Sequence, residues 1–226
     1  MKMTDNHHRD HDSPSLFMDE TFWNERYGST GALWSGNPNP QLVQEVSGLA
    51  PETALDAGCG EGADAIWLAE HGWQVTAVDI STVALERGAA QALQAGAQVA
   101  ERITWIQADL ATWIPPAESF DLVSIHFMQF PRDYRERIYR RLAEAVALNG
   151  TLLVVAHHPS DLQTAMPRPH LPDMFFTGDD LAAELEFDPH QWEIVTNAAP
   201  GRTTTDPDGR AVTIRDTVLR ARRRLL

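Results

Sequence analysis

The chain has one cysteine, few basic residues and no long hydrophobic run. A lone cysteine, Cys59, cannot form an internal disulfide bond, which excludes a small fold held together by disulfides. No apolar segment has the length of a membrane span or the character of a secretory leader, so we expect a cytoplasmic protein that does not contact membranes. The 18 basic residues against 32 acidic ones give a formal charge of −14, and this charge repels nucleic acid. A small molecule is therefore the expected partner.

The length of 226 residues fits one domain and is enough for a sizeable core. Residues 1–15 are polar and lack periodicity, so they predict a disordered tail, and residues 16–226 form the predicted domain. The histidines of the tail have no ordered scaffold that would hold a metal, and the body of the chain has no metal-ligand cluster. We predict no metal site, and we expect either a monomer or a homodimer.

From residue 53 onward, apolar strand-like runs alternate with helical periodicity, which predicts an α/β fold. The predicted strands are 53–57, 74–79, 103–107, 120–126, 150–156, 191–197 and 211–221. Helices are predicted at 17–28, 40–49, 61–71, 82–95 and 132–147, and a late helix starts at a capping box formed by Thr177 and Asp180. The turn Asp206-Pro-Asp-Gly209 predicts a hairpin between the last two strands. The expected architecture is a Rossmann-like, doubly wound, mostly parallel seven-stranded sheet with a C-terminal antiparallel hairpin strand.

A glycine-rich turn between the first predicted strand and the next helix is the most informative segment. Gly58, Gly60 and Gly62 have no Cβ, so the backbone can turn sharply and an anionic group of a ligand can approach the amides. The turn fits the dinucleotide fingerprint Gly58-x-Gly60-x-x-Ala63, and Asp79 lies where that fingerprint expects a carboxylate that binds both ribose hydroxyls. The turn and Asp79 therefore indicate a cofactor that contains adenosine, and they fit both a dinucleotide and another adenosine cofactor.

Two further carboxylates favour a cofactor other than a dinucleotide. Asp56 lies two residues before the first glycine, where dinucleotide folds usually keep an apolar residue. Asp109 ends the third predicted strand, where it can accept the exocyclic amine of adenine.

Four segments resemble, in order and spacing, the motifs of class I S-adenosylmethionine-dependent methyltransferases. They are Leu55-Asp-Ala-Gly-Cys-Gly-Glu-Gly62, Val78-Asp-Ile-Ser81, Gln107-Ala-Asp-Leu110 and Phe120-Asp-Leu-Val-Ser124. Trp67-Leu-Ala-Glu-His-Gly72 and the upstream aromatic residues resemble the branch that holds tellurite-resistance and thiopurine methyltransferases. The resemblance implies S-adenosylmethionine as cofactor and a sheet with an appended hairpin.

The resemblance also implies an enzyme that transfers a methyl group to a small-molecule thiol, chalcogen or hydroxyl. A nicotinamide-dependent oxidoreductase and a non-catalytic S-adenosylmethionine-binding protein remain as alternatives. Cys59 lies inside the glycine turn, so the covalent attack used on cytosine has no nucleophile. No Asn/Asp-Pro-Pro-aromatic motif follows the fourth predicted strand, which disfavours methylation of adenine or glutamine amines.

Cofactor-binding residues are expected in the N-terminal segment and at the ends of the predicted strands. They are Trp23, Tyr27, Trp34, Asp56, Gly58, Cys59, Gly60, Asp79, Ile80, Asp109, Leu110 and Ile125. We expect the backbone N–H groups from Gly58 to Gly60 and the N-terminus of the following helix to hold the methionine carboxylate, and Asp56 to bind the ammonium directly or through water. By resemblance, residues 16–50 form a helical lid with an aromatic wall. The long connection 158–177 is a candidate substrate loop.

His126 and His157 are the candidate catalytic residues, because each follows or ends a predicted strand on the side where α/β proteins bind ligands. Two roles fit a histidine there. It can take a proton from a thiol or hydroxyl acceptor, or it can bind a backbone carbonyl and serve the fold alone.

Overall fold

The computed structural model describes residues 19–29, 31, 35–167 and 172–225. The predicted tail, residues 1–15, lies outside these ranges. The helices are α1 (Glu20–Gly28), α2 (Pro40–Val46), α3 (Ala63–Glu70), α4 (Thr82–Ala95), α5 (Ala97–Ala100), α6 (Arg132–Glu144) and α7 (Gly178–Glu184). Two 3-10 turns, η2 (Pro159–Gln163) and η3 (Pro172–Met174), lie in the connection before α7. Within the described ranges, no helix has both the length and the apolar character needed to cross a membrane.

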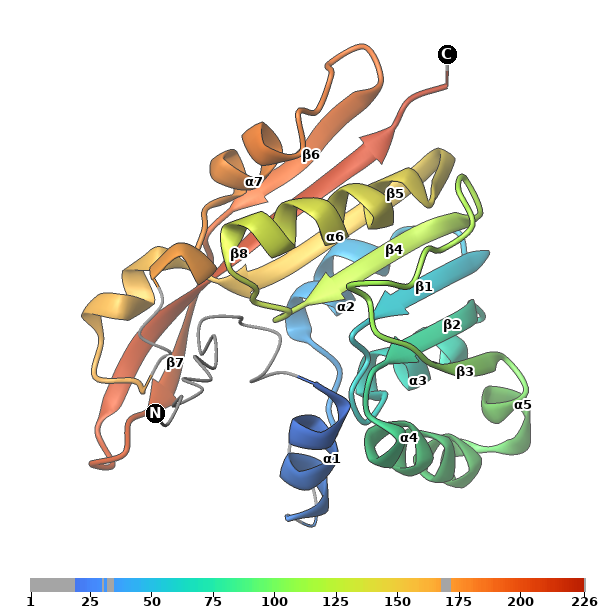
Figure 1. The fold of residues 1–226 in the computed structure, drawn as a ribbon, viewed down its shortest axis with the longest axis horizontal. Coiled ribbons are helices and arrows are strands. Elements are labelled where there is room, and N and C mark those ends of the chain that lie inside the picture. Colours follow the sequence, from blue (N-terminus) through green and yellow to red (C-terminus); the bar gives the residue numbers. More distant parts are fainter. Residues whose placement is uncertain (1–18, 30, 32–34, 168–171, 226) are drawn as a thin grey trace, which may run out of the picture.

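Eight strands form one mixed sheet, which confirms the predicted fold class (Figure 1). They are β1 (Thr53–Ala57), β2 (Gln74–Asp79), β3 (Ile103–Gln107), β4 (Phe120–His126), β5 (Val146–His157), β6 (Trp192–Ala198), β7 (Gly201–Thr205) and β8 (Ala211–Arg223). The order is β3-β2-β1-β4-β5-β8-β6, with β7 paired to β8 outside this path. The first five strands are parallel, and β8 lies antiparallel between β5 and β6.

The prediction of seven strands was wrong by one, because β7 is an additional strand. The turn at 206–210 joins β7 to β8, and Asp206 accepts the backbone N–H groups of Asp208 and Arg210 at 3.0 and 2.8 Å. The hairpin partner of the last strand across this turn is thus β7 and not the strand predicted at 191–197. The predicted helix 132–147 is also shorter, since Val146 already pairs with Phe120 of β4.

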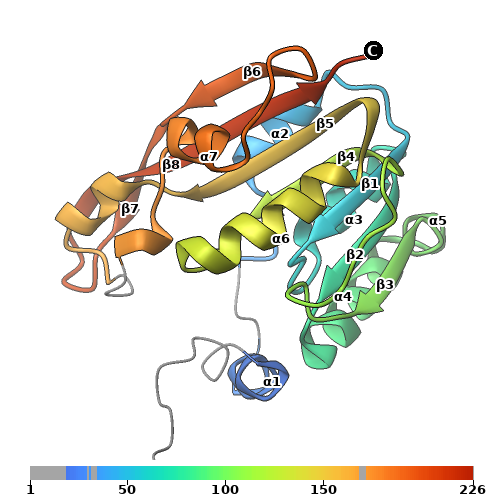
Figure 2. The same ribbon diagram turned by 45° about the horizontal axis from the view of Figure 1, so that its top comes forward.

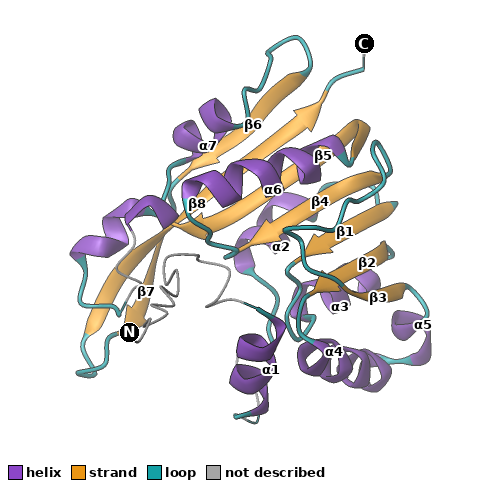
Figure 3. Ribbon diagram, in the orientation of Figure 1, coloured by secondary structure: helices purple, strands orange, loops and turns teal. Residues whose placement is uncertain are grey.

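Helices cover both faces of the sheet, and each face has its own apolar core (Figures 1 and 3). On one face, α6 and α7 pack on Leu55, Val123 and Leu152. On the other face, α2 and α3 pack on residues that include Ala54 and Leu122. Neighbouring residues of β1 enter opposite cores because side chains alternate along a strand. This two-sided burial explains why the central strands are apolar throughout.

The topological switch point lies between β1 and β4, where the chain leaves β3 and returns to the other side of β1. In open α/β sheets, ligands bind beyond the carboxyl ends of the strands at this point. The register places Ala57 opposite Ile125, so the residues after β1 and those after β4 meet there. Figures 1 and 2 show α1 standing off the sheet, beside the start of α4.

Trp105 of β3 packs its indole ring against two glycines, Gly62 of the turn and Gly88 of α4. A Cβ on Gly62 would lie 2.3 Å from the Trp105 ring, and a Cβ on Gly88 would lie 2.6 Å from it. Both distances are too short for non-bonded carbon atoms. These two positions therefore need glycine so that β3, α4 and the turn can approach one another.

We predict that Gly88→Ala lowers the free energy of unfolding by about 1 to 2 kcal/mol. The clash with Trp105 and with the Glu61 carbonyl outweighs the higher helix propensity of alanine. Urea unfolding measures the change. Gly28→Ala, in α1 where nothing lies within 4 Å of the new Cβ, is the matched control and is expected to be neutral or slightly stabilising. Equal effects of the two substitutions would contradict this account of the packing.

Candidate active site

A cavity of about 840 Å³ opens at the carboxyl ends of the parallel strands. This volume lies in the range of roughly 300 to 1,000 Å³ typical of small-molecule sites. The structure places most of the predicted site residues around this one cavity, namely Trp23, Tyr27, Asp56, Gly58, Cys59, Gly60, Asp79, Ile80, Asp109, Leu110, His126 and His157. Ile125 is fully buried in the core and does not line the cavity, and Trp34 lies outside the described residues.

Asp79, at the end of β2, is buried and holds the glycine turn in place. One carboxylate oxygen accepts the N–H of Gly60 at 2.8 Å, and the other accepts the N–H of Ser81 at 2.9 Å. Burial raises the pKa of Asp79, and the hydrogen bonds from Ser81 and Gly60 oppose this rise. Ser81 in turn caps α4, because its side chain accepts the N–H of Ala84 at 3.1 Å. One side chain therefore joins the turn, β2 and the start of α4.

The backbone N–H groups from Gly58 to Gly60 already have partners within the protein, so the predicted contact with a ligand carboxylate falls to the helix N-terminus named with them. Gly58 and Cys59 donate to the carbonyl of Val78 at 2.8 and 3.0 Å, and Gly60 donates to Asp79. The turn uses these donors to bind itself to β2. The first turn of α3 follows directly, and its N-cap, Gly62, offers no side-chain cap. Amide groups at this helix end remain the ones that can meet an anion.

Gly58 has a backbone that an L side chain rarely adopts, with φ of +73°. A Cβ there would lie 2.3 Å from the sulfur of Met128. Cys59, the next residue, remains a neutral thiol: burial, together with the negative charges of Asp56 and Asp79, raises its pKa well above the ordinary value. This agrees with the absence of a cysteine nucleophile in the predicted chemistry.

Asp56 ends in the cavity wall with an incomplete set of partners. Asp56 is 2% exposed, and the Ser124 hydroxyl donates to one of its carboxylate oxygens at 3.3 Å. The other oxygen is buried and has no hydrogen-bond partner among the described residues. Burial, followed by the negative charge of Asp64, raises the pKa of Asp56 to about 7, while His126 opposes the rise. A cation placed against this carboxylate would relieve the cost of burying its charge.

His126 lies at the end of β4 and is bound to a carboxylate rather than to a backbone carbonyl. Its Nδ1 is 2.7 Å from Asp64 of α3, and Asp64 also accepts the N–H of Asn39 at 2.6 Å. The Nε2 atom is buried and has no partner among the described residues, and the residue is part of the cavity lining. Burial lowers the pKa of His126, but Asp64 and then Asp56 outweigh it, so the pKa is raised. An Asp-bound imidazole with its second nitrogen available is the arrangement that orients a general base.

His157 lies at the end of β5, further along the same cavity. Its Nδ1 is 3.9 Å from the carboxylate of Asp161, which is beyond hydrogen-bond distance. The ring packs at a tilt against Phe127, with centroids 4.7 Å apart, and stacks against Phe175 at 6.4 Å. The structure thus brings both candidate histidines to the cavity, and His126 has a short contact with a carboxylate.

The wall between the two histidines is apolar. Phe127, Met128, Phe130 and Met174 line it. Phe127 has φ of +51°, an unfavourable backbone for a bulky residue, and its N–H donates to the carbonyl of Val155 at 2.7 Å. Such strain is held at sites where the surrounding structure needs a side chain in one place.

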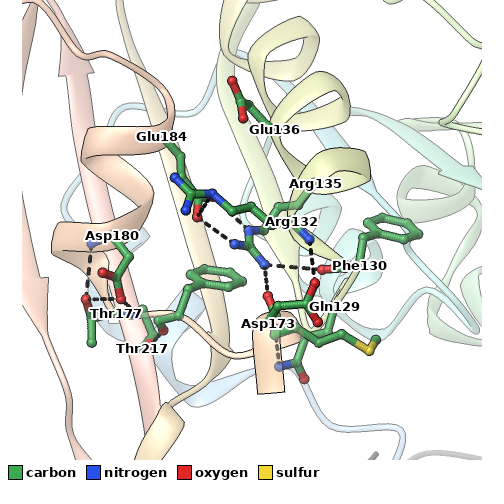
Figure 4. A network of polar contacts seen from close by, with 12 residues as sticks. Gln129, Phe130, Arg132, Arg135, Glu136, Asp173, Thr177, Asp180, Glu184 and Thr217 are labelled. Carbon is green, nitrogen blue, oxygen red and sulfur yellow. Dashed lines mark hydrogen bonds and ion pairs between the residues drawn. The ribbon is translucent and has the colours of Figure 1, made fainter. Parts of the chain in front are cut away.

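Buried Arg135 of α6 fixes this apolar wall from behind (Figure 4). Its guanidinium makes a two-pronged contact with Glu184 of α7, at 3.0 and 2.7 Å. It also donates to the carbonyls of Asp173 at 2.8 Å and Phe130 at 3.2 Å, and it lies 4.3 Å above the ring of Phe176. The loop after β4 and the segment before α7 are tied to two helices in this way.

Helix α1 lines the cavity on the side of the glycine turn. Asn24 accepts hydrogen bonds from Ser81 at 2.7 Å and from the N–H of Val83 at 3.3 Å, so α1 is bound to the start of α4. Trp23 and Tyr27 line the cavity with ring centroids 6.0 Å apart. Asp109 lies opposite, after β3, and is exposed; one of its oxygens accepts the N–H of Ala111 at 2.8 Å.

Several residues at the cavity were not predicted from the sequence. They are Asp64, Asn39, Met128, Arg202 and Asp216. Asp64 could have been predicted from the sequence, because it lies in the first turn of the helix that follows the glycine turn. Arg202 and Asp216 belong to the hairpin of β7 and β8, and β7 itself was missed.

Known proteins resemble this chain both in sequence and in fold. Residues 54–150 match the methyltransferase domain family. A 2-heptyl-1-hydroxyquinolin-4(1H)-one methyltransferase of Mycobacteroides abscessus is 27% identical over 66% of this chain and 70% of its own length. A thiopurine S-methyltransferase of Aliivibrio fischeri is 27% identical over 61% of this chain and 71% of its own length.

Two solved structures share the fold. One is from work on the conversion of a disulfide bond into a thioacetal group during echinomycin biosynthesis. It has a TM-score of 0.70 at 22% sequence identity, and the match covers 93% of this chain and 91% of that chain. TehB from Haemophilus influenzae has a TM-score of 0.64 at 20% identity, covering 91% of this chain and 67% of its own. Domain, relatives and fold agree with the four motifs and with S-adenosylmethionine as cofactor. The methyltransferase domain at residues 54–150, the relatives and the shared fold support a class I S-adenosylmethionine-dependent methyltransferase similar to the tellurite-resistance and thiopurine enzymes.

Proposed function

We propose that this enzyme methylates the sulfur of a small thiol, with selenium, tellurium and hydroxyl acceptors as progressively less favoured classes. The observation that carries the proposal is one cavity with two different ends. At one end, carboxylates surround the glycine turn. At the other end lies the apolar wall, with His126 beside it. The names of the two relatives, a thiopurine S-methyltransferase and a hydroxyquinolinone methyltransferase, support sulfur or oxygen as the acceptor atom.

The residues at the glycine turn fit a cofactor that is cationic at one end and carries adenosine at the other. The unpartnered oxygen of Asp56 suits the ammonium, and the uncapped first turn of α3 suits the carboxylate. Asp79 has lone pairs left for ribose hydroxyls, and Asp109 can accept the adenine amine. Trp23 and Tyr27 present aromatic rings on the same side, where a sulfonium gains from a ring face. Cys59, Ile80 and Leu110 complete this wall.

When bound, S-adenosylmethionine supplies an electrophilic methyl group on a sulfonium. His126 would take the proton of the acceptor on Nε2, and Asp64 would hold the imidazole by Nδ1. The acceptor sulfur could then bond to the methyl carbon as the bond from that carbon to the sulfonium breaks, which leaves neutral S-adenosylhomocysteine. Phe127, Met128 and Met174 keep water away from the thiolate. A dry wall favours this step because the anionic acceptor and the cationic donor neutralise each other.

The proposed acceptor class is tested with purified enzyme and methyl-labelled S-adenosylmethionine. The panel contains thiols, thiopurines, metalloid oxyanions, phenols and N-hydroxy compounds, and mass spectrometry identifies the methylated product. We expect the highest kcat/KM for sulfur acceptors. Turnover of hydroxyl acceptors with none of the sulfur compounds would contradict the assignment to sulfur.

Asp79→Ala is expected to weaken binding of S-adenosylmethionine and S-adenosylhomocysteine by about 10- to 100-fold. The substitution removes a charged acceptor from two hydroxyls and releases the N–H of Gly60. Calorimetry measures both dissociation constants. Asp121→Asn is the control, because Asp121 bonds Thr53 at the opposite end of β4 and should leave the affinity unchanged. An unaltered affinity in Asp79→Ala would remove this residue from the cofactor site.

His126→Gln is expected to lower kcat by about 10²- to 10⁴-fold, the usual contribution of a general base. The base must be neutral to accept a proton, so wild-type activity falls as the pH drops through the raised pKa of His126. This acid limb should vanish in His126→Gln and move to lower pH in Asp64→Asn, because Asp64 raises that pKa.

The acceptor for these pH profiles is an aliphatic thiol whose own pKa lies above the range tested. His157→Gln is the control and should keep the acid limb, and the cofactor affinity of each variant shows that the site is intact. Retention of the limb in His126→Gln would exclude this histidine as the titrating base.

A further inference from the structure

The far end of the cavity is built by the hairpin of β7 and β8, which extends past the end of β5 (Figure 1). Arg202 of β7 and Asp216 of β8 both line the cavity there. The register places Asp216 directly opposite His157 of β5. This corner therefore adjoins the apolar wall on which the acceptor is proposed to bind.

Arg202 is held in one orientation by a buried carboxylate. Its Nε donates to both oxygens of Asp216, at 3.2 and 3.0 Å, and Asp216 is 1% exposed. The two terminal amino groups of Arg202 make no hydrogen bond to any described residue, and the side chain is 39% exposed. A planar guanidinium that is hydrogen-bonded through Nε presents its remaining N–H donors in a fixed direction.

The charge pattern of the cavity makes this arginine unusual. The described lining contains the carboxylates of Asp56, Glu61, Asp64, Asp79, Asp109 and Asp216, but its basic side chains, histidines aside, are only Arg26 and Arg202. Arg26 is exposed on α1, with its guanidinium 5.9 Å from the Trp23 ring centroid, at the end assigned to the cofactor. Within the described lining, Arg202 is thus the arginine of the acceptor end, in a protein with a charge of −14.

We propose that Arg202 binds a carboxylate on the methyl acceptor, so that the substrates are apolar thiols that carry an acid group away from the sulfur. The proposal rests on the proposed function for the position of the acceptor. A planar carboxylate matches the donors of a guanidinium, and Phe127, Met128 and Met174 offer contact to an apolar body between the two groups.

Binding to the protein saturated with S-adenosylhomocysteine tests this subsite without any need for turnover. The probes are 4-mercaptobenzoate and its methyl ester, which differ in charge but share the apolar body and the thiol. Calorimetry on the wild-type protein should show the carboxylate binding at least about tenfold tighter than the ester. Equal affinities, or no binding of either probe, would overturn the proposal.

Substitutions separate recognition from a purely structural Arg–Asp pair. Arg202→Gln should abolish the preference for the carboxylate, and Arg202→Lys, which keeps the charge beside Asp216, should retain only part of it. Arg210→Gln is the matched control, because Arg210 lies in the same hairpin, is exposed and pairs with Asp208. Thermal unfolding of each variant reports folding. A merely structural role lowers stability but leaves the ratio of the two affinities unchanged, and that outcome would overturn the proposal.

A failure of the Arg202 subsite can be distinguished from a failure of the proposed function. If the carboxylate preference depends on Arg202 but no thiol is methylated, the subsite stands and the assignment of sulfur as acceptor fails. If thiols are methylated with equal kcat/KM for acid and ester, the function stands and the subsite fails.

Discussion

The buried carboxylate of Asp79 is the contact on which the site depends. It binds the N–H of Gly60 and the N–H of Ser81, and Ser81 in turn caps α4 and meets Asn24 of α1. A glycine turn has little conformational preference of its own, because glycine tolerates many backbone angles. The carboxylate, together with the carbonyl of Val78, selects one of these conformations. The same small set of bonds therefore positions the turn, the cap of α4 and the helix that lines the cavity.

Charge is distributed unevenly along the cavity, and this distribution suits a reaction between a cation and an anion. The end near the turn holds Asp56, whose pKa is raised to about 7 by burial and by neighbouring Asp64. A cationic ligand stabilises the ionised form of such a group. The apolar wall and Arg202 lie beyond, where an anionic acceptor is proposed to bind.

The acceptor end is held by long-range contacts rather than by local geometry. Arg135 links the loop after β4 to the segment before α7, across a separation of 49 residues to Glu184. Its burial would be costly without partners, but Glu184, two carbonyls and the Phe176 ring all contact it.

The sequence by itself determined the fold class, the glycine turn and the carboxylates at the ends of β1, β2 and β3. These features depend on local spacing, since a strand followed by alternating glycines places its end residues in the same way wherever the strand lies. Only the tertiary structure decided which groups meet. The pairing of His126 with Asp64 spans 62 residues, and the position of Arg202 depends on β7, a short threonine-rich strand that acquires its conformation from pairing with β8. Such contacts follow from the order of strands in the sheet, and no local pattern in the chain encodes that order.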